Sequence, residues 1–242
     1  MKIFDIDGPL MQFLNKVANL MILNFLTILC CLPIFTIGAA LTALHYMCLK
    51  MIRNEDNYIC KGYFKAFKEA FKPATKVWLI VMLIVGVLVA DYYIMAKSGL
   101  EFNQWFTAVL GAIAIFVAFM VTMVFPVMAK FTNTTLQTIK NALAIGILQF
   151  PKTILMIIMN VIPVFIAFNV YSLMPFVLMF GFSAPAYGSA ALYNGYFKRL
   201  EEQIIAAREK LEGPKKEEEE DDGVEKIFSD KLDEALVDRQ EL

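Results

Sequence analysis

Few side chains in the apolar parts of this sequence could do acid–base or metal chemistry. The single histidine, His45, lies inside an apolar run, and Asp91 is the one acidic residue well inside another. An ionisable group at membrane depth is a functional candidate, so both are candidate sites if these runs cross a membrane. Each has an alternative: His45 as a neutral packed ring, and Asp91 as a carboxylate at the outer interface.

Other polar residues give weaker signals. Gln12, Asn15 and Asn19 share one face of a helix, which predicts hydrogen bonds between helices or, alternatively, a substrate path. The sequence contains no P-loop, dinucleotide-binding fingerprint or zinc-protease pattern. Four cysteines lack metal-ligand spacing: Cys30, Cys31, Cys48 and Cys60. We therefore predict no catalytic, cofactor or metal site, and no enzyme activity.

The composition favours an integral membrane protein. Of the 242 residues, 59% are hydrophobic and 19% are charged, whereas a soluble domain is about half apolar and about a quarter charged. The net charge of −1 averages an apolar part, residues 1–200, and an acidic part, residues 201–242. Because the lysines stand at the edges of apolar runs and form no bulk basic patch, we expect no nucleic-acid partner.

The apolar runs predict an all-α integral membrane protein, a six-helix transmembrane bundle of three hairpins. Pro33 stops the first run, and Gly38 gives the backbone freedom for a tight return into the second. Similar inner loops before the third and fifth runs suggest a repeated hairpin, with chance similarity as the alternative. The predicted spans cover about residues 9–32, 34–52, 75–95, 105–128, 153–170 and 173–197.

The placement of the cations predicts the orientation. With the N-terminus inside, only Lys97 of the 22 lysines and arginines falls outside, as the positive-inside rule requires. A five-span alternative needs one helix across residues 33–38 and moves the lysines of residues 50–76 outside. We therefore expect a membrane domain over residues 1–212 with both termini cytoplasmic.

Residues 62–72 are predicted to form a separate helix on the inner membrane surface. Phe64, Phe67 and Phe71 continue a stripe from Tyr63, and three lysines fall on the other side. Lysines on the polar face suit an anionic leaflet. Pro73 is expected to end this helix, and residues 132–148 form a second, weaker amphipathic segment. The alternative is a helix packed on its own bundle.

The C-terminal sequence changes character. The sixth span is expected to continue as a helix until Gly213-Pro214, and residues 217–222 are six consecutive carboxylates. The acidic cytoplasmic tail, residues 213–242, then regains an apolar stripe, which predicts a short amphipathic helix that docks in a partner's groove. A disordered solubilising tail is the alternative. The candidate docking residues are Ile227, Phe228, Leu232 and Leu236.

The first third of the chain resembles the YesL-like family of bacterial membrane proteins, also called domain of unknown function 624. The resemblance covers about residues 8–200 and is most specific over 30–71. The residues that carry it include Gly8, Pro9, Phe13, Asn24, Pro33, Gly38, Tyr46, Arg53, Tyr58, Phe64, Phe67 and Phe71. Of these, Pro33, Gly38, Tyr46, Arg53, Phe64, Phe67 and Phe71 join His45 and Asp91 as candidate structural or functional residues.

This resemblance implies a location in a bacterial plasma membrane and a function, without supplying catalytic residues. Genes of the family often stand beside carbohydrate ABC-transporter genes. The implied function is a non-enzymatic accessory or regulatory component linked to carbohydrate uptake, with membrane lipid and an ABC-transporter component as partners. The alternative is a small-solute permease that acts through its own bundle, although an ion-coupled carrier usually needs more charges at mid-membrane.

Overall fold

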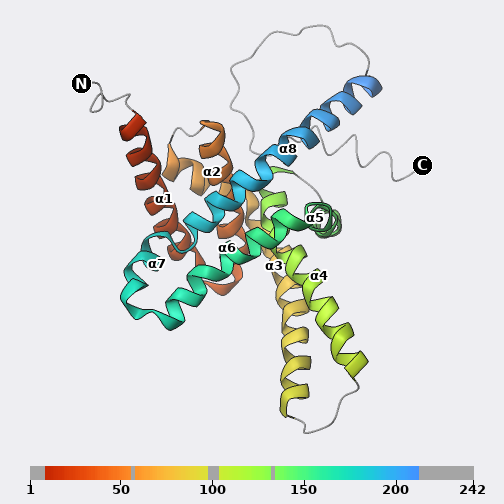
Figure 1. The fold of residues 1–242 in the computed structure, drawn as a ribbon. Coiled ribbons are helices and arrows are strands. Elements are labelled where there is room, and N and C mark those ends of the chain that lie inside the picture. Colours follow the sequence, from red (N-terminus) through yellow and green to blue (C-terminus); the bar gives the residue numbers. More distant parts are fainter. Residues whose placement is uncertain (1–8, 56–57, 98–103, 132–133, 213–242) are drawn as a thin grey trace.

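The structure is a computed structural model that describes residues 9–55, 58–97, 104–131 and 134–212, and its regular elements there are helices (Figure 1). Five of these helices are long and apolar enough to cross a membrane, or six if the bent pair α7 and α8 counts as one span. An all-helical, multi-pass membrane protein is therefore confirmed. In chain order the elements are α1 (Pro9–Cys31), η1 (Ile34–Thr36), α2 (Ile37–Arg53), α3 (Ile59–Lys97), α4 (Gln104–Lys130), α5 (Thr135–Leu148), α6 (Phe150–Asn169), η2 (Tyr171–Leu173), α7 (Met174–Phe180) and α8 (Ser183–Glu212).

Helix α2 fills the centre of the molecule. It packs against α1, α3, α4 and α8, and 12 of its 17 residues are buried. Small side chains such as Ala39, Ala40 and Ala43 are fully covered, and small residues allow close approach of helices in lipid. Asn54 caps the end of the helix with a left-handed backbone (φ 55°). The backbone N–H groups of Asn54 and Glu55 donate to the carbonyls of Met51 and Lys50 in the last turn.

Helix α3 corrects the prediction that Pro73 separates a surface helix from a membrane span. It is one helix of 39 residues with Pro73 inside it. Proline removes one backbone hydrogen bond, but packed neighbours can hold such a helix together. Here Ala70 and Ala74 on either side of Pro73 are both buried, and they belong to a buried face that repeats every three or four residues from Tyr63 to Val81.

The turn of the first hairpin lies beside the middle of α3. The indole Nε1 of Trp78 donates to the carbonyl of Ile34 at 2.8 Å, and a Cβ placed on Gly38 would lie 2.7 Å from both the Ala74 oxygen and the Trp78 Cβ. Along the axis of α3, Trp78 lies about 28 Å before Lys97, the last residue of the helix. The predicted three-hairpin arrangement is not confirmed, because the first turn and the second stand at different levels along α3.

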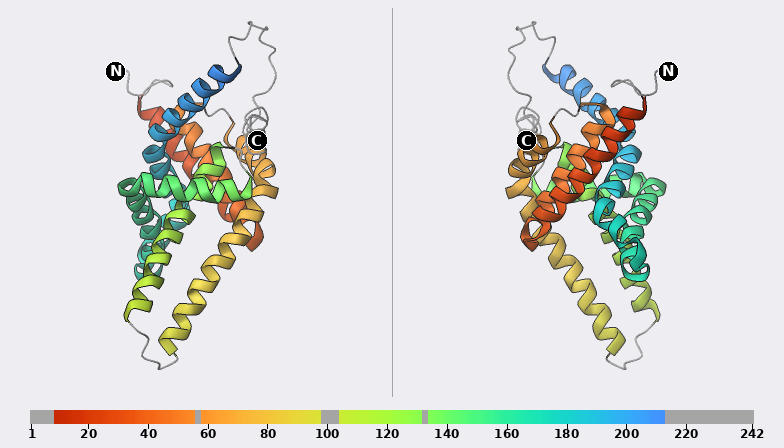
Figure 2. Two further views of the ribbon diagram at one scale, coloured as in Figure 1. Left: turned by 90° about the vertical axis from the view of Figure 1, so that its right-hand side faces the viewer. Right: turned by 90° about the vertical axis from the view of Figure 1, so that its left-hand side faces the viewer.

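The outer halves of α3 and α4 leave the rest of the molecule together (Figures 1 and 2). From Met82 to Lys97 and from Trp105 to Ala118, no residue is buried. We call these two segments the arm. The remaining described residues form the body, where α4 becomes buried from Phe119 onward.

Helix α5 lies across the other helices, as Figure 2 shows. It begins with a capping box, in which the side chains of Thr134 and Gln137 bond each other's backbone. It packs mainly on α4. The predicted amphipathic segment 132–148 is therefore a helix of the body over its described residues.

The predicted sixth span, residues 173–197, is interrupted. It consists of η2, α7 and the first half of α8, and α7 and α8 meet at a bend of 51° around Gly181. Continuation as a helix after residue 197 is confirmed, because α8 runs to Glu212. Its last turns extend from the body at the end opposite the arm (Figure 1). The predicted tail, residues 213–242, lies outside the described residues.

Candidate functional site

Two buried aromatic residues of α2 and α8 face each other at the centre of the body. The hydroxyl of Tyr193 lies 3.4 Å from Nδ1 of His45, and both side chains are buried. The Tyr193 ring packs on Phe197, which in turn packs on Phe131 with centroids 5.2 Å apart. His45 thus has a packed position with one hydrogen-bond partner, and a proton-relay role stays an untested prediction.

Arg53 is the centre of a partly buried charge cluster, and this was not apparent from the sequence. Its guanidinium donates to both carboxylate oxygens of Glu201 at 3.0 and 3.1 Å, and its Nε donates to Asn194 at 3.0 Å. Lys130 of α4 adds a contact of 3.3 Å to Glu201. Only 9% of the Arg53 side chain is exposed. The cluster joins the ends of α2 and α4 to α8, and a two-pronged arginine–carboxylate contact fixes direction as well as distance.

Asn24 of α1 holds the bend between α7 and α8. Its Nδ2 donates to the carbonyl of Leu178 at 2.7 Å, while its Oδ1 accepts from the backbone N–H groups of Phe182 and Ser183 at 2.8 and 3.0 Å. The side chain is fully buried. One amide therefore satisfies both ends of a broken helix, as backbone groups in lipid require.

Sequence reasoning used Asn24 only as part of the family resemblance and missed this role. A signal was present, since Pro175, Gly181 and Pro185 interrupt the last apolar run. Short or Gly/Pro-interrupted apolar segments mark broken helices. The partner in α1, more than 150 residues away, could not be read from the chain.

The remaining predicted residues fall into two groups. Pro33 precedes and Gly38 follows the first turn, η1, in which Phe35 packs edge-on against Phe71 with ring centroids 6.4 Å apart. Phe67 lies between Tyr63 and Phe71 in the same series of rings, so the structure supports packing on the bundle for this face. The other residues lie apart: Phe64 is exposed, Asp91 is half-buried in the arm, and Tyr46 lies beneath Lys50 in a cation–π contact.

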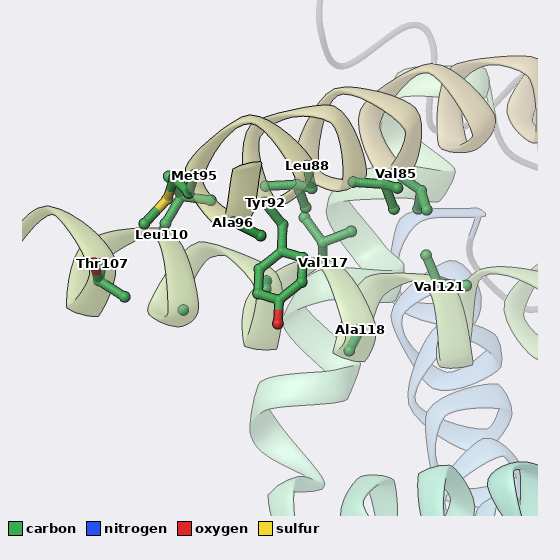
Figure 3. A pocket seen from close by; sticks show the side chains of 13 residues that line it. Val85, Leu88, Tyr92, Met95, Ala96, Thr107, Leu110, Val117, Ala118 and Val121 are labelled. Atoms are coloured by element: carbon green, nitrogen blue, oxygen red, sulfur yellow. The ribbon is translucent and has the colours of Figure 1, made fainter. Parts of the chain in front are cut away.

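An apolar cleft lies between the two helices of the arm (Figure 3). It has a volume of about 760 Å³. Tyr92 points into it from α3, and α4 contributes a line of small residues at spacings of three and four: Thr107, Gly111, Ala114 and Ala118. A Cβ added at Gly111 would meet nothing within 4 Å, so the chain's own packing leaves this surface open. A smaller cavity of about 420 Å³ lies between α6, α7 and α8.

The contacts of these places are hydrogen bonds, ion pairs and packed rings. No group of three or more His, Cys, Asp or Glu side chains able to hold a metal is found among the described residues. The four candidate tail residues, Ile227, Phe228, Leu232 and Leu236, lie outside the described residues. Their docking role stays a prediction.

Comparison with known proteins identifies one domain. Residues 20–92 match the family described as "Protein of unknown function, DUF624". No curated protein and no solved structure matches the chain.

Proposed function

We propose that this multi-pass membrane protein, whose residues 20–92 form a DUF624 domain, is a non-enzymatic accessory component of a transport system in the bacterial plasma membrane. In this proposal it binds a transmembrane helix of that system in the cleft of the arm. A carbohydrate ABC transporter is the partner that the family resemblance implies. The orientation that the cations favour puts both termini in the cytoplasm.

The observation that carries the proposal is the contrast between a filled centre and an open side. Helix α2 occupies the axis of the body, with Ala43, Met47 and Met51 almost fully buried. A permease that acted through this bundle would have to displace α2. The cleft of the arm, in contrast, is open sideways toward the place where a neighbouring membrane protein would lie.

The lining of the cleft favours a helix as its occupant. Helices associate in lipid by close packing across small residues, without a hydrophobic driving force of their own. The small face of α4 around Gly111 offers such a contact, and the exposed Gly111 makes no close contact that a larger side chain would disturb. A partner helix on this face would gain packing that lipid chains give less completely.

Photocrosslinking tests this proposal. A benzophenone amino acid in place of Leu110, which lines the cleft, should capture a membrane-spanning subunit of a sugar transporter in native membranes. Gly111→Leu should abolish the capture without loss of the folded protein. Gly86→Leu is the matched control, because Gly86 also has open space at its Cβ and does not line the cleft.

The outcomes separate the alternatives. Capture of lipid alone, or capture that survives Gly111→Leu, would show that the cleft binds no partner helix. Solute uptake by the purified protein in vesicles would favour the permease.

A further inference from the structure

The first half of α3 carries an exposed line of positive charge, which we call the lysine stripe: Lys61, Lys65, Lys68, Lys72 and Lys76. At 3.6 residues per turn the five side chains fall within about 80° of one another. They lie on the side of α3 opposite its buried face, which packs against α2. The stripe extends about 22 Å along the helix axis.

The described residues leave most of this charge without a counterion. Among them, none of Lys65, Lys68, Lys72 and Lys76 forms an ion pair. Between Asn57 and Ala90 the sequence has one carboxylate, Glu69, against the five lysines. Because α3 is continuous through Pro73, the five lysines belong to one rigid surface and are not divided between two elements.

The complementary charge is in the same chain. Residues 1–212 contain 17 lysines and arginines and 11 aspartates and glutamates, whereas residues 213–242 contain 5 and 12. The acidic residues of the tail include six in succession, Glu217 to Asp222. Six extended residues cover about 20 Å, close to the length of the stripe.

We propose that the acidic segment Glu217–Asp222 binds the lysine stripe of α3. The ion pairs form between carboxylates and amines at the surface, so each pair is weak and the strength comes from their number. Tethering raises the local concentration of the acidic segment to the millimolar range, where such weak contacts suffice. The bound segment covers the first lysines of the stripe and holds the rest of the tail beside α3.

The covalent path permits this contact. Glu201 is bonded to Arg53, and Arg53 precedes the first residue of α3, Ile59, by only six positions. Helix α8 therefore leaves the body at the end where the stripe begins. From Glu201 to Glu212 the helix extends about 17 Å. When extended, the chain from Glu212 reaches about 17 Å at Glu217 and about 35 Å at Asp222. The far end of the acidic segment can thus return past the level of Glu201 and meet the lysines at the start of the stripe.

Carbodiimide crosslinking of the full chain tests the proposal, because this reagent joins a carboxylate to a nearby lysine by an amide bond. The protein is placed in nanodiscs of zwitterionic phosphatidylcholine, and the crosslinked peptides are identified by mass spectrometry. We expect crosslinks from residues 217–222 to concentrate at residues 61–76. They should fall severalfold between about 0.1 M and about 1 M salt, over which the Debye length falls from about 10 to about 3 Å.

Two triple variants separate a specific contact from general charge attraction. Lys65→Gln with Lys68→Gln and Lys72→Gln should remove most of the tail crosslinks, including those to Lys61 and Lys76. The control, Lys140→Gln with Lys152→Gln and Lys198→Gln, removes the same charge elsewhere and should leave them intact. An even spread of crosslinks over all lysines, or equal effects of both variants, would overturn the proposal.

A second measurement uses the native thiol beside the stripe. Cys60 is exposed and immediately precedes Lys61. Replacement of the six carboxylates by amides should speed the labelling of Cys60 by an anionic maleimide. Unchanged labelling would contradict the proposal. If the stripe is shielded only in nanodiscs that contain anionic lipid, with no tail crosslinks in zwitterionic ones, its occupant is the leaflet and the proposal is wrong.

Discussion

The body and the arm share the helices α3 and α4, and these helices have different surroundings in the two regions. Before Met82, one face of α3 is buried against α2; beyond it, no residue of α3 is buried. Helix α4 shows the reverse order, exposed at its start and buried from Phe119 onward. The body therefore owes its geometry to contacts within the chain. The arm has an apolar surface that the other described residues leave uncovered, and lipid or a partner can cover it.

The comparison teaches that apolarity and burial are separate properties in this protein. The outer half of α3 is strongly apolar, and none of its residues from Met82 to Lys97 is buried. Helix α2 is less apolar, yet most of its residues are buried. In a membrane the lipid is as apolar as leucine, so the most apolar helix gains little from an internal position. Small and polar side chains, such as Ala43 and His45, mark the interior instead.

Loss of the Arg53 charge should lower the free energy of unfolding more than any other change below. Its size measures how far the stability of the body depends on this charge. Arg53→Gln breaks the contact with Glu201 and should lower the free energy of unfolding by about 3 kcal/mol, at the low end for a broken buried pair because Lys130 remains. Reversible unfolding in mixed micelles measures it. Lys97→Gln in the arm is the control and should change little. Equal effects of the two variants would contradict the distinction between body and arm.

Loss of the Asn24 amide should be the next largest effect. Asn24→Leu takes the side-chain acceptor away from the N–H groups of Phe182 and Ser183. Because both groups belong to one bend that can relax as a unit, we expect a loss of about 2 kcal/mol in total, within the range for unsatisfied buried groups. Asn169→Leu is the matched control, because the Asn169 amide is exposed and donates only within its own helix, to Phe165 at 2.9 Å. The same unfolding assay should separate the two. In addition, hydrogen exchange should rise at the α7–α8 bend in the first variant only.

Substitution of two glycines in contrasting surroundings should change the free energy of unfolding in opposite directions. Gly38→Ala forces apart α2 and α3, where a Cβ would lie 2.7 Å from a backbone oxygen, and should destabilise by about 1–3 kcal/mol. Gly86→Ala in the arm meets nothing within 4 Å and should stabilise by up to about 1 kcal/mol through helix propensity. Thermal unfolding of both variants in detergent is the measurement. A destabilising Gly86→Ala would mean that the arm packs against something already.

Removal of the buried Ser189 hydroxyl should give the smallest change in the free energy of unfolding. The Oγ of Ser189 is fully buried, with no hydrogen-bond partner among the described residues. Ser189→Ala removes an unsatisfied group, so we expect a gain of stability of less than about 1 kcal/mol. A marked loss would reveal a partner for this hydroxyl, such as a bound water molecule.

Local elements could be predicted from the sequence, whereas most contacts could not. The break at Pro33 and the helical run to Glu212 follow from proline, glycine and apolar periodicity alone. Gly38 was expected to free the backbone for the turn, and this was wrong: Gly38 lies in the first turn of α2, where its missing side chain allows close contact with α3. Pro73 was expected to end a helix, but the buried alanines around it hold α3 together. That choice depends on α2, a neighbour that local sequence does not specify.

The candidate site shows the same limit. Arg53 could be named from the resemblance, but Asn194 and Glu201 lie 141 and 148 positions away, and nothing in their local sequence pairs them with it. The bend at Gly181 had a local signal, while its partner Asn24 had none. Long-range polar pairs depend on how the helices assemble, and a single sequence carries little information about that.

Helix α8 is held at two points, by Asn24 at its first turn and by Arg53 at Glu201. About 27 Å of helix separates these points, and the helix continues past the second. Between the two points α8 is one continuous helix that packs on α1, α2 and α6. A force on its exposed last turns would therefore act on a rigid rod and reach α1 through Asn24 and α2 through Arg53 together.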